Sequence, residues 1–378
     1  MKILVIRNSW IVAGAELYHI KLSKSFDELK NNCELVLITN NPVFLKLASE
    51  NGIRSYLVDV FGEEVGTKKG ILRLLFTLPS YIYCYLQTIK KIRAEVDPDV
   101  LVLSGKTEKY VLTPLTKLIG LPIVWIEHGQ VFTGTISKIA LLLYRFSSFF
   151  CKLIMIESKD AYENLLKNGI RQSILSYIGS GIDIRFFKKK LNISFQEELI
   201  VGFVATICWE KGIQEFMETI KILSKTQKKI SFIVVGDGPQ LEYAKKFAKN
   251  HNLNNLVVFM GRQNNVKDFF EKISIILAPI SHSGGISLST QEAMSMSCVP
   301  IVSDFGGNRE LVLHEITGFI FKNNFAENAS ATILKLYDNR DLLNKITINA
   351  RKHIESNYDI YLLANNWKNN LMKVIKSH

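Results

Sequence analysis

Residues 275–312 read IILAPISHSGGISLSTQEAMSMSCVPIVSDFGGNRELV and contain the clearest fold signal of the chain. A short apolar run, Ile275–Ala278, leads into a glycine loop and a helical stretch, and a second apolar run follows at Val299–Ser303. Short β-branched runs that alternate with longer amphipathic stretches are typical of βαβ units, whose strands are parallel. The stretch therefore predicts an α/β fold with a parallel sheet.

The same alternation extends over the whole chain and predicts two sheets. In the first half, strands are expected at Lys2–Arg7, Glu34–Thr39, Ser55–Val58, Val100–Leu103, Ile123–Glu127 and Leu153–Glu157. In the second half, they are expected at Ile200–Ala205, Ile230–Val235, Leu256–Phe259, Ile275–Ala278 and Val299–Ser303. Two series of strands in 378 residues imply two similar α/β domains, since a domain usually takes about 100 to 200 residues.

The boundary between the two domains is expected within residues 179–196, where glycines and a run of lysines interrupt the rhythm of strands and helices. This predicts a first domain at residues 1–180 and a second at residues 181–357. A helical tail follows at residues 358–378.

The composition excludes several classes of protein. Hydrophobic residues make up 47% and charged residues 22% of the chain, which is unlike disordered, collagenous or disulfide-scaffold proteins. The cysteines are scattered singly and form no CxxC pair, so neither a disulfide framework nor a metal site is expected, and a cytoplasmic location fits. They are Cys33, Cys84, Cys151, Cys208 and Cys298. The start, MKILVIRNSW, turns polar after six residues and is interpreted as a first strand, not as a signal peptide.

The formal net charge of +12 predicts attraction to an anionic partner. Nucleic acid, a nucleotide and an anionic lipid surface all fit that charge. Nucleic acid is disfavoured, because the lysines and arginines are dispersed and no recognition module is found.

Two apolar segments raise the question of a membrane. In residues 70–93 only 16 uncharged residues separate Arg73 from Lys90, fewer than the roughly 20 that a spanning helix needs. In residues 141–152 aromatic side chains alternate with Arg145 and Lys152. Each segment fits a helix packed on the first sheet or a helix at a membrane surface, and periodicity does not separate the two.

Two residues of the first half are candidates for ligand binding. Gly14 lies in the first strand-to-helix turn, where the backbone can approach an anion and the next helix begins. His128 follows the strand Ile123–Glu127, at the edge where open α/β sheets bind ligands. An ordinary turn and a histidine that only packs or caps are the alternatives.

The second half offers a site for phosphate. Lys211 precedes a helix expected to begin near Ile213, and a lysine there can reach a phosphate at the helix amino terminus. The loop at Gly284 and Gly285 precedes another helix, on which Glu292 is expected about two turns in and is a ready acceptor for ribose hydroxyls. The alternatives are that Lys211 is only a solvated lysine and that the glycine loop is only a tight turn. Together with His128, these loops predict a nucleotide in a cleft between the domains.

Taken in order, these motifs resemble the retaining glycosyltransferases of family 4, which have the GT-B architecture. The resemblance covers nearly the whole chain. It rests on AGAE at 13–16, EHG at 127–129, IGSGIDIRFF at 178–187, EKG at 210–212, GDGP at 236–239 and QEAMSMSCVPIVSDFGGNRE at 291–310. It implies two Rossmann-like domains whose parallel sheets face each other across a cleft. The first would bind the acceptor and the second the donor, and the tail would cross back to the first.

The resemblance also implies roles for individual residues. His128 would contact the donor sugar near the reacting carbon, and Lys211 would neutralise the diphosphate leaving group, so these two are the catalytic candidates. Gly14 would approach the diphosphate and Glu292 would bind the ribose. The remaining donor-binding candidates are Thr206, Gly236, Arg262, Gly284, Gly285, Ile286, Ser287 and Leu288. The donor would be linked to UDP or GDP, and neither a metal nor a cofactor would be needed.

Two positions depart from the family pattern. Gly284 stands eight residues before Glu292, where the family usually has a glutamate that contacts the sugar. Thr206 stands five residues before Lys211, where the family often has an arginine. We hypothesise that His282 or Arg262 replaces one of these missing charged side chains.

The sequence thus predicts a retaining glycosyltransferase of bacterial surface polysaccharide or glycolipid assembly, with a saccharide or lipid-linked acceptor, peripheral at the inner face of the plasma membrane. An epimerase of the same architecture and a nucleotide-sugar-binding protein without turnover are the alternatives. The second alternative is motivated by the two departures.

Overall fold

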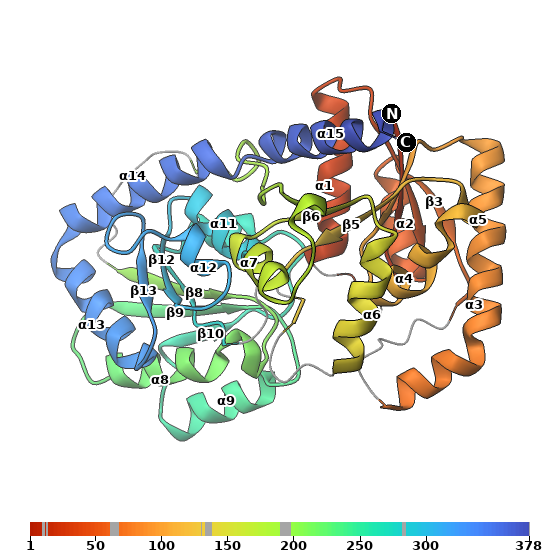
Figure 1. Ribbon diagram of the computed structural model, residues 1–378. Helices are drawn as coiled ribbons and strands as arrows, with labels where there is room; N and C mark the ends of the chain where they lie inside the picture. Colours follow the sequence, from red (N-terminus) through yellow and green to blue (C-terminus); the bar gives the residue numbers. More distant parts are fainter. Residues whose placement is uncertain are drawn as a thin grey trace. The chain divides into compact units, whose positions relative to one another are not determined.

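The computed structural model describes residues 1–9, 12, 14–60, 68–129, 131–132, 138–189, 198–281 and 285–377. These residues form two compact units. The first contains Met1–Gly179 and Ile360–His378, and the second contains Ser180–Asp359. The chain therefore leaves the first unit once and returns to it with its last helix (Figure 1).

The first unit is built on a parallel sheet of seven strands in the order β3-β2-β1-β4-β5-β6-β7. The strands are β1 (Lys2–Ile6), β2 (Glu34–Thr39), β3 (Arg54–Leu57), β4 (Val100–Leu103), β5 (Ile123–Glu127), β6 (Leu153–Ile156) and β7 (Leu175–Tyr177). The helices are α1 (Gly14–Glu28), α2 (Pro42–Glu50), α3 (Lys68–Glu95), α4 (Lys106–Leu112), α5 (Thr116–Ile119), α6 (Lys138–Phe149), α7 (Lys159–Lys167) and α15 (Ile360–Lys376). Short 3₁₀ helices lie at η1 (Thr113–Leu115) and η2 (Gln172–Ile174).

Both faces of this sheet are buried, which explains why its strands are almost continuously apolar. Leu4 of β1 lies between Val36 and Leu101 of the neighbouring strands, and all three face the core beneath α3 to α7. The next residue, Val5, faces the opposite core beneath α1, α2 and α15. This alternation lets one short strand contribute to two hydrophobic cores.

The last helix belongs to the first unit. Helix α15 packs against α1, and the two helices cross in Figure 1. The Trp367 side chain is fully buried there, and its indole Nε1 donates a hydrogen bond to the Tyr18 hydroxyl at 2.9 Å. The expected tail therefore forms part of a hydrophobic core.

The second unit is built on a parallel sheet of six strands in the order β10-β9-β8-β11-β12-β13. The strands are β8 (Leu199–Val204), β9 (Ile230–Val235), β10 (Val257–Phe259), β11 (Ile275–Ala278), β12 (Val299–Ser303) and β13 (Phe319–Phe321). The helices are α8 (Ile213–Leu223), α9 (Leu241–Asn250), α10 (Lys267–Phe270), α11 (Leu288–Ser295), α12 (Asn308–Leu311), α13 (Phe325–Asp338) and α14 (Arg340–Asn357), with a 3₁₀ turn η3 (Trp209–Lys211). Figure 1 shows α8 and α9 on one face of the sheet and α11 and α12 on the other.

The structure confirms the predicted fold class, two Rossmann-like α/β units with parallel sheets. It adds two strands that the sequence pattern does not predict, β7 and β13. Each has three residues and lies at the edge of its sheet. A run of three residues is too short to show a period, so its sequence resembles that of a loop.

The apolar segment at residues 70–93 is part of one helix, α3, with Pro79 inside it. Tyr81, Tyr85, Ile89 and Ile92 are buried against the first sheet, at helical spacing. Of the two alternatives, a helix packed on the first sheet or a helix at a membrane surface, the first is therefore correct for this face of α3. Among the described residues, no helix is both long enough and apolar enough to span a bilayer.

Candidate functional site

In the first unit, polar side chains gather at the carboxyl ends of the strands around β1 and β4. The strand order reverses direction between these two strands, and open α/β sheets bind ligands at such a point. Arg7 follows β1 and Ser104 follows β4, and the guanidinium Nη1 of Arg7 donates to the Ser104 hydroxyl at 3.2 Å. The Nε of Arg7 also pairs with Glu16 of α1 at 2.8 Å.

His128 lies next to this pair, directly after β5. Its Nε2 is 3.1 Å from the Ser104 hydroxyl, and its Nδ1 is 3.0 Å from a carboxylate oxygen of Glu157, which follows β6. The Tyr18 ring packs edge-on against the imidazole, with 5.2 Å between centroids. Hydrogen bonds at both nitrogens fix the ring orientation, as a histidine that contacts a substrate requires. The side chain keeps 23% of its surface exposed, so a ligand can reach it.

The third polar feature of this edge is a buried carboxylate. Glu108 of α4 is 2% exposed and accepts hydrogen bonds from the Tyr81 hydroxyl at 3.1 Å and from the Asn8 amide. Burial raises the pKa of Glu108 above its ordinary value, against the hydrogen bonds and the positive charge of Arg7. The folded protein therefore holds a proton on Glu108 at pH values where the unfolded chain has lost it.

This shift makes stability depend on pH. A carboxyl pKa that is higher in the folded state contributes stability below the unfolded pKa, and that contribution is lost as pH rises through the folded pKa. The Glu108→Gln variant keeps the shape of the side chain but has no carboxyl group that can titrate. We expect the free energy of unfolding of the natural protein, relative to this variant, to fall as pH rises from acid to neutral. Urea titrations of both proteins across this range measure the difference, and a pH-independent difference would contradict the assignment.

Behind His128 lies a buried ion pair. The Lys109 ammonium is 2.8 Å from Glu127 and donates to the Ile126 carbonyl at 2.6 Å. The Tyr144 hydroxyl of α6 donates to the same Glu127 carboxylate at 2.9 Å. Burial lowers the pKa of Lys109, and Glu127 opposes that shift. Since Glu127 directly precedes His128, the pair fixes both α6 and the end of β5.

Gly14 is the first residue of α1 and is exposed. The structure thus places it where the sequence predicted, at the amino terminus of the helix that follows β1. The free N–H groups of such a terminus are suited to an anion.

In the second unit, the strand order reverses between β8 and β11. The loop after β8 contains the turn η3, which ends at Lys211, and the loop after β11 begins at Pro279. The Ser281 amide donates to the Glu210 carbonyl at 3.0 Å, so the two loops are joined. Gly212 has φ 78°, and a Cβ there would lie 2.0 Å from the Pro279 carbonyl oxygen. Only glycine permits this approach.

Lys211 is half-buried within this arrangement. Burial lowers the pKa of its ammonium, and the nearby Cys208 and Glu210 act in the opposite direction. Helix α8 begins at Ile213, as predicted, two residues after Lys211. The structure therefore places a cation next to a helix amino terminus.

The loop after β11 leads into α11. Ser287 caps this helix, accepting a hydrogen bond from the Thr290 amide at 3.3 Å, and Leu288 is its first residue. Ile286 is buried against Gly307, where a Cβ would come within 2.6 Å of the Ile286 side chain. The segment just before α11 is thereby packed closely against the glycine turn at Gly306 and Gly307.

Glu292 is the fifth residue of α11, so it lies one turn into the helix and not two, as expected from the sequence. The difference arises because Ser287 caps the helix later than the glycine loop suggested. The side chain is 8% exposed. Gly285 is half-buried at the end of the loop. Gly284 and His282 lie outside the described residues.

The other donor-binding candidates lie along the same edge. Thr206 is exposed in the loop after β8. Gly236, with φ 140°, follows β9, and a Cβ on it would lie 1.9 Å from the Ala205 carbonyl oxygen. Arg262 is exposed and follows β10, the edge strand of the sheet. Strand β9 lies between β10 and β8. The structure thus groups Thr206 and Gly236 closely and places Arg262 further along the edge.

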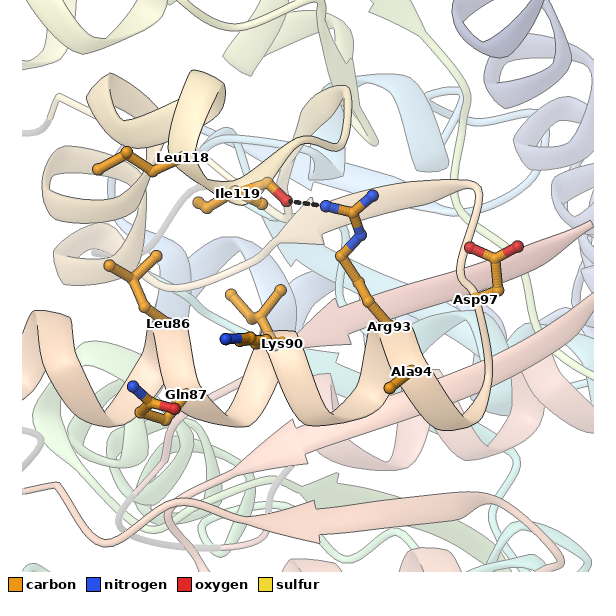
Figure 2. Close-up of a pocket in the computed structure, with 9 residues that line it drawn as sticks. Leu86, Gln87, Lys90, Arg93, Ala94, Asp97, Leu118 and Ile119 are labelled. Atoms are coloured by element: carbon orange, nitrogen blue, oxygen red, sulfur yellow. Dashed lines mark hydrogen bonds between the residues drawn. The ribbon is translucent and has the colours of Figure 1, made fainter.

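A surface hollow of ≈ 590 Å³ lies elsewhere, between α3 and α5. Figure 2 shows Arg93 of α3 reaching across it to the Ile119 carbonyl, which accepts a hydrogen bond at 3.0 Å. Because α3 and α5 end just before β4 and β5 begin, this hollow lies at the amino ends of the strands. The polar residues described above lie at the opposite edge.

Among the residues of the first unit's site that were missed from sequence are Arg7, Ser104 and Glu157. Each follows the last residue of a strand at the carboxyl edge, which is the signal that could have identified them. Two of the predicted strands extend to Arg7 and Glu157, and this places both residues inside a strand. The structure ends these strands at Ile6 and Ile156.

Comparison with known proteins agrees with this geometry. Residues 183–353 match the family model described as glycosyl transferases group 1. The match covers most of the second unit. The group 1 glycosyltransferase match contains Lys211, Gly236, Glu292 and the glycine turns around α11. This match supports the resemblance to glycosyltransferases that the sequence motifs indicate.

Relatives and solved structures extend the likeness beyond residues 183–353. An uncharacterized glycosyltransferase of Methanocaldococcus jannaschii is 29% identical over 67% of the chain and 67% of its own length. The Escherichia coli UDP-Gal:alpha-D-GlcNAc-diphosphoundecaprenol alpha-1,3-galactosyltransferase is 26% identical over 65% of the chain and 67% of its own length. The crystal structure of Anabaena HepE in complex with UDP has a TM-score of 0.83 at 16% identity, covering 99% of this chain and all of that one. The fold is therefore GT-B.

Proposed function

We propose that this protein is a glycosyltransferase that moves a sugar, with retention and without a metal, from a UDP- or GDP-linked donor to a saccharide or lipid-linked acceptor of bacterial surface polysaccharide or glycolipid assembly. One observation supports it above the others. The loops after β8 and β11 are joined at the point where the strand order reverses, and they contribute Lys211 and the capped amino end of α11. This combination suits a diphosphate.

The chemistry that this site supplies is electrostatic. When the bond between sugar and diphosphate breaks, negative charge grows on the departing diphosphate. Fixed backbone amides and the Lys211 ammonium stabilise the transition state more than the ground state, because the departing diphosphate carries more negative charge there. Since these groups are already in place, they need no reorganisation. Glu292 accepts hydrogen bonds from the ribose hydroxyls. No protein nucleophile takes part in this scheme.

His128 acts in the first unit on the donor sugar. Glu157 at Nδ1 and Ser104 at Nε2 hold the imidazole in one orientation. Because the ring is held before any ligand binds, contact with the sugar costs little side-chain entropy. Glu157 is therefore a positioning residue.

Two comparisons support the substrate classes. The Escherichia coli relative is named for an acceptor on diphosphoundecaprenol, which supports a lipid-linked acceptor here. The Anabaena structure contains UDP, which supports a uridine nucleotide over a guanosine nucleotide.

A thermal-shift screen of the full chain tests the donor. A ligand that binds only the folded protein at about 100 times its Kd adds about 2.7 kcal/mol of stability. We expect UDP, GDP or one of their sugars to raise the melting temperature by several degrees, and the corresponding ATP sample to leave it unchanged. If no nucleotide or nucleotide sugar shifts the transition, the proposed function is wrong.

Product analysis separates the proposal from its alternatives. The donor that gives the shift is incubated with and without a membrane-extract acceptor. A new glycolipid only in the presence of the acceptor supports a transferase. A changed nucleotide sugar without acceptor indicates an epimerase, and binding without either product indicates a protein that has lost turnover.

A further inference from the structure

Helix α6 presents a continuous apolar stripe on the surface of the first unit. Its large hydrophobic side chains recur at helical spacing and so lie on one face of the helix. Leu142 is 67% exposed and Phe149 is 68% exposed. We call the set the α6 stripe, and its members are Ile139, Leu142, Leu143, Phe146, Phe149 and Phe150.

The opposite face of α6 is fully engaged with the first unit. Tyr144 is 1% exposed, binds Glu127 and packs edge-on against Trp125 and Phe132, with 4.9 and 5.1 Å between ring centroids. Ser147 is buried on the same side. Since this face is held by a hydrogen bond to a buried ion pair, the helix cannot turn to bury the α6 stripe. The described residues thus leave the α6 stripe exposed, and an exposed apolar surface of this kind suits an external partner.

The surroundings of the α6 stripe are positively charged. Residues 128–156 contain no aspartate or glutamate, whereas Arg145 lies on α6 and Lys152 follows it. The guanidinium of Arg171 lies 5.1 Å from the centre of the Phe149 ring. An anionic partner therefore fits this surface.

A second copy of the chain fits less well. In a two-fold dimer the same patch meets itself, so the cations around one α6 stripe would face the same cations around the other. Like charges brought together in an apolar interface are unfavourable. A lipid surface with anionic headgroups suits both the apolar stripe and the cations around it. Its boundary with the acyl chains accepts apolar side chains, and its phosphates pair with cations.

We propose that the α6 stripe docks on an anionic membrane surface, with α6 lying along it and its apolar side chains in the boundary between headgroups and acyl chains. This inference rests on the proposed function, because a lipid-linked acceptor would be presented at such a membrane surface. The Tyr144 and Glu127 contact attaches the docked helix to the segment that holds His128. Lipid binding itself requires no turnover.

Vesicle co-sedimentation of the full chain tests the proposal. Binding is expected to vesicles that contain phosphatidylglycerol and to be weaker by at least about tenfold for vesicles of phosphatidylcholine alone. The Leu142→Ser/Phe149→Ser variant is expected to lose at least about tenfold in affinity, since it removes two apolar side chains from the bilayer. Raising salt from about 0.1 M to about 1 M shortens the screening length from about 10 Å to about 3 Å and should also weaken binding.

The control is Val258→Ser/Ile348→Ser, which changes two apolar residues of the second unit that are 55% and 43% exposed. It should bind vesicles like the natural protein. The nucleotide-induced thermal shift of each variant reports its fold and the donor site independently of lipid. Equal vesicle binding by the α6 variant, no preference for anionic lipid, or a dimer in solution that the α6 variant dissolves would each overturn the proposal.

Discussion

Replacing Lys211 with alanine is expected to lower the rate of sugar transfer by about 10²- to 10³-fold, because removing one fixed donor to a developing anion costs that much in comparable sites. The Lys211 ammonium is half-buried, so its charge acts in a less polar medium than water, where electrostatic interactions are stronger. Its position depends on Gly212, whose close approach to the Pro279 carbonyl joins the two loops.

Steady-state kinetics with saturating donor measure the effect on kcat, and the melting temperature of the variant without ligand checks the fold. Lys249→Ala, which removes an exposed lysine of α9, is the matched control and should keep full activity. Lys211→Arg retains the charge and should recover part of the rate. Undiminished transfer by Lys211→Ala would exclude this residue from stabilisation of the leaving group.

The second large effect concerns stability. We expect Trp367→Ala to lower the free energy of unfolding by about 3 to 5 kcal/mol, the usual cost of removing a large aromatic side chain from a core. Trp367 is fully buried between α15 and the first sheet. Its removal also leaves the buried Tyr18 hydroxyl without the indole donor.

Urea unfolding, followed by the fluorescence of the remaining tryptophans, measures the loss. Leu362→Ala is the control, because Leu362 lies on the same helix but is 44% exposed, and it should cost less than about 1 kcal/mol. Tyr18→Phe isolates the hydrogen bond from the packing. A loss below about 1 kcal/mol for Trp367→Ala would mean that α15 is not needed for the stability of the first unit.

Much of the second unit's site was predictable because its residues are neighbours along the chain. Lys211 lies two residues before α8, and residues 285–287 lead directly into α11. Local spacing is therefore enough to place them. The predicted position of Glu292 was wrong by a turn, since the cap residue and not the glycine loop sets where the helix begins.

The site of the first unit was less predictable because its residues are distant in sequence. His128 was found from its place after a strand, but its partners Ser104 and Glu157 come from two other strands. A single sequence contains no information on which strand ends lie side by side. The strand order supplies it, since β4, β5 and β6 are adjacent.

From residue order alone, the chain reveals most of its strands, the helical segments between them, two parallel sheets and the loops suited to phosphate, because these depend on interactions between neighbours a few residues apart. Helix α6 shows the limit of that information. Periodicity places Tyr144 and Phe146 on different faces, yet both are aromatic, and nothing local says which face meets the sheet. The hydrogen bond from Tyr144 to Glu127, seventeen residues earlier, turns one face inward and leaves the α6 stripe outside. Contacts between distant segments form only when the chain packs, and for that reason only the tertiary structure decides them.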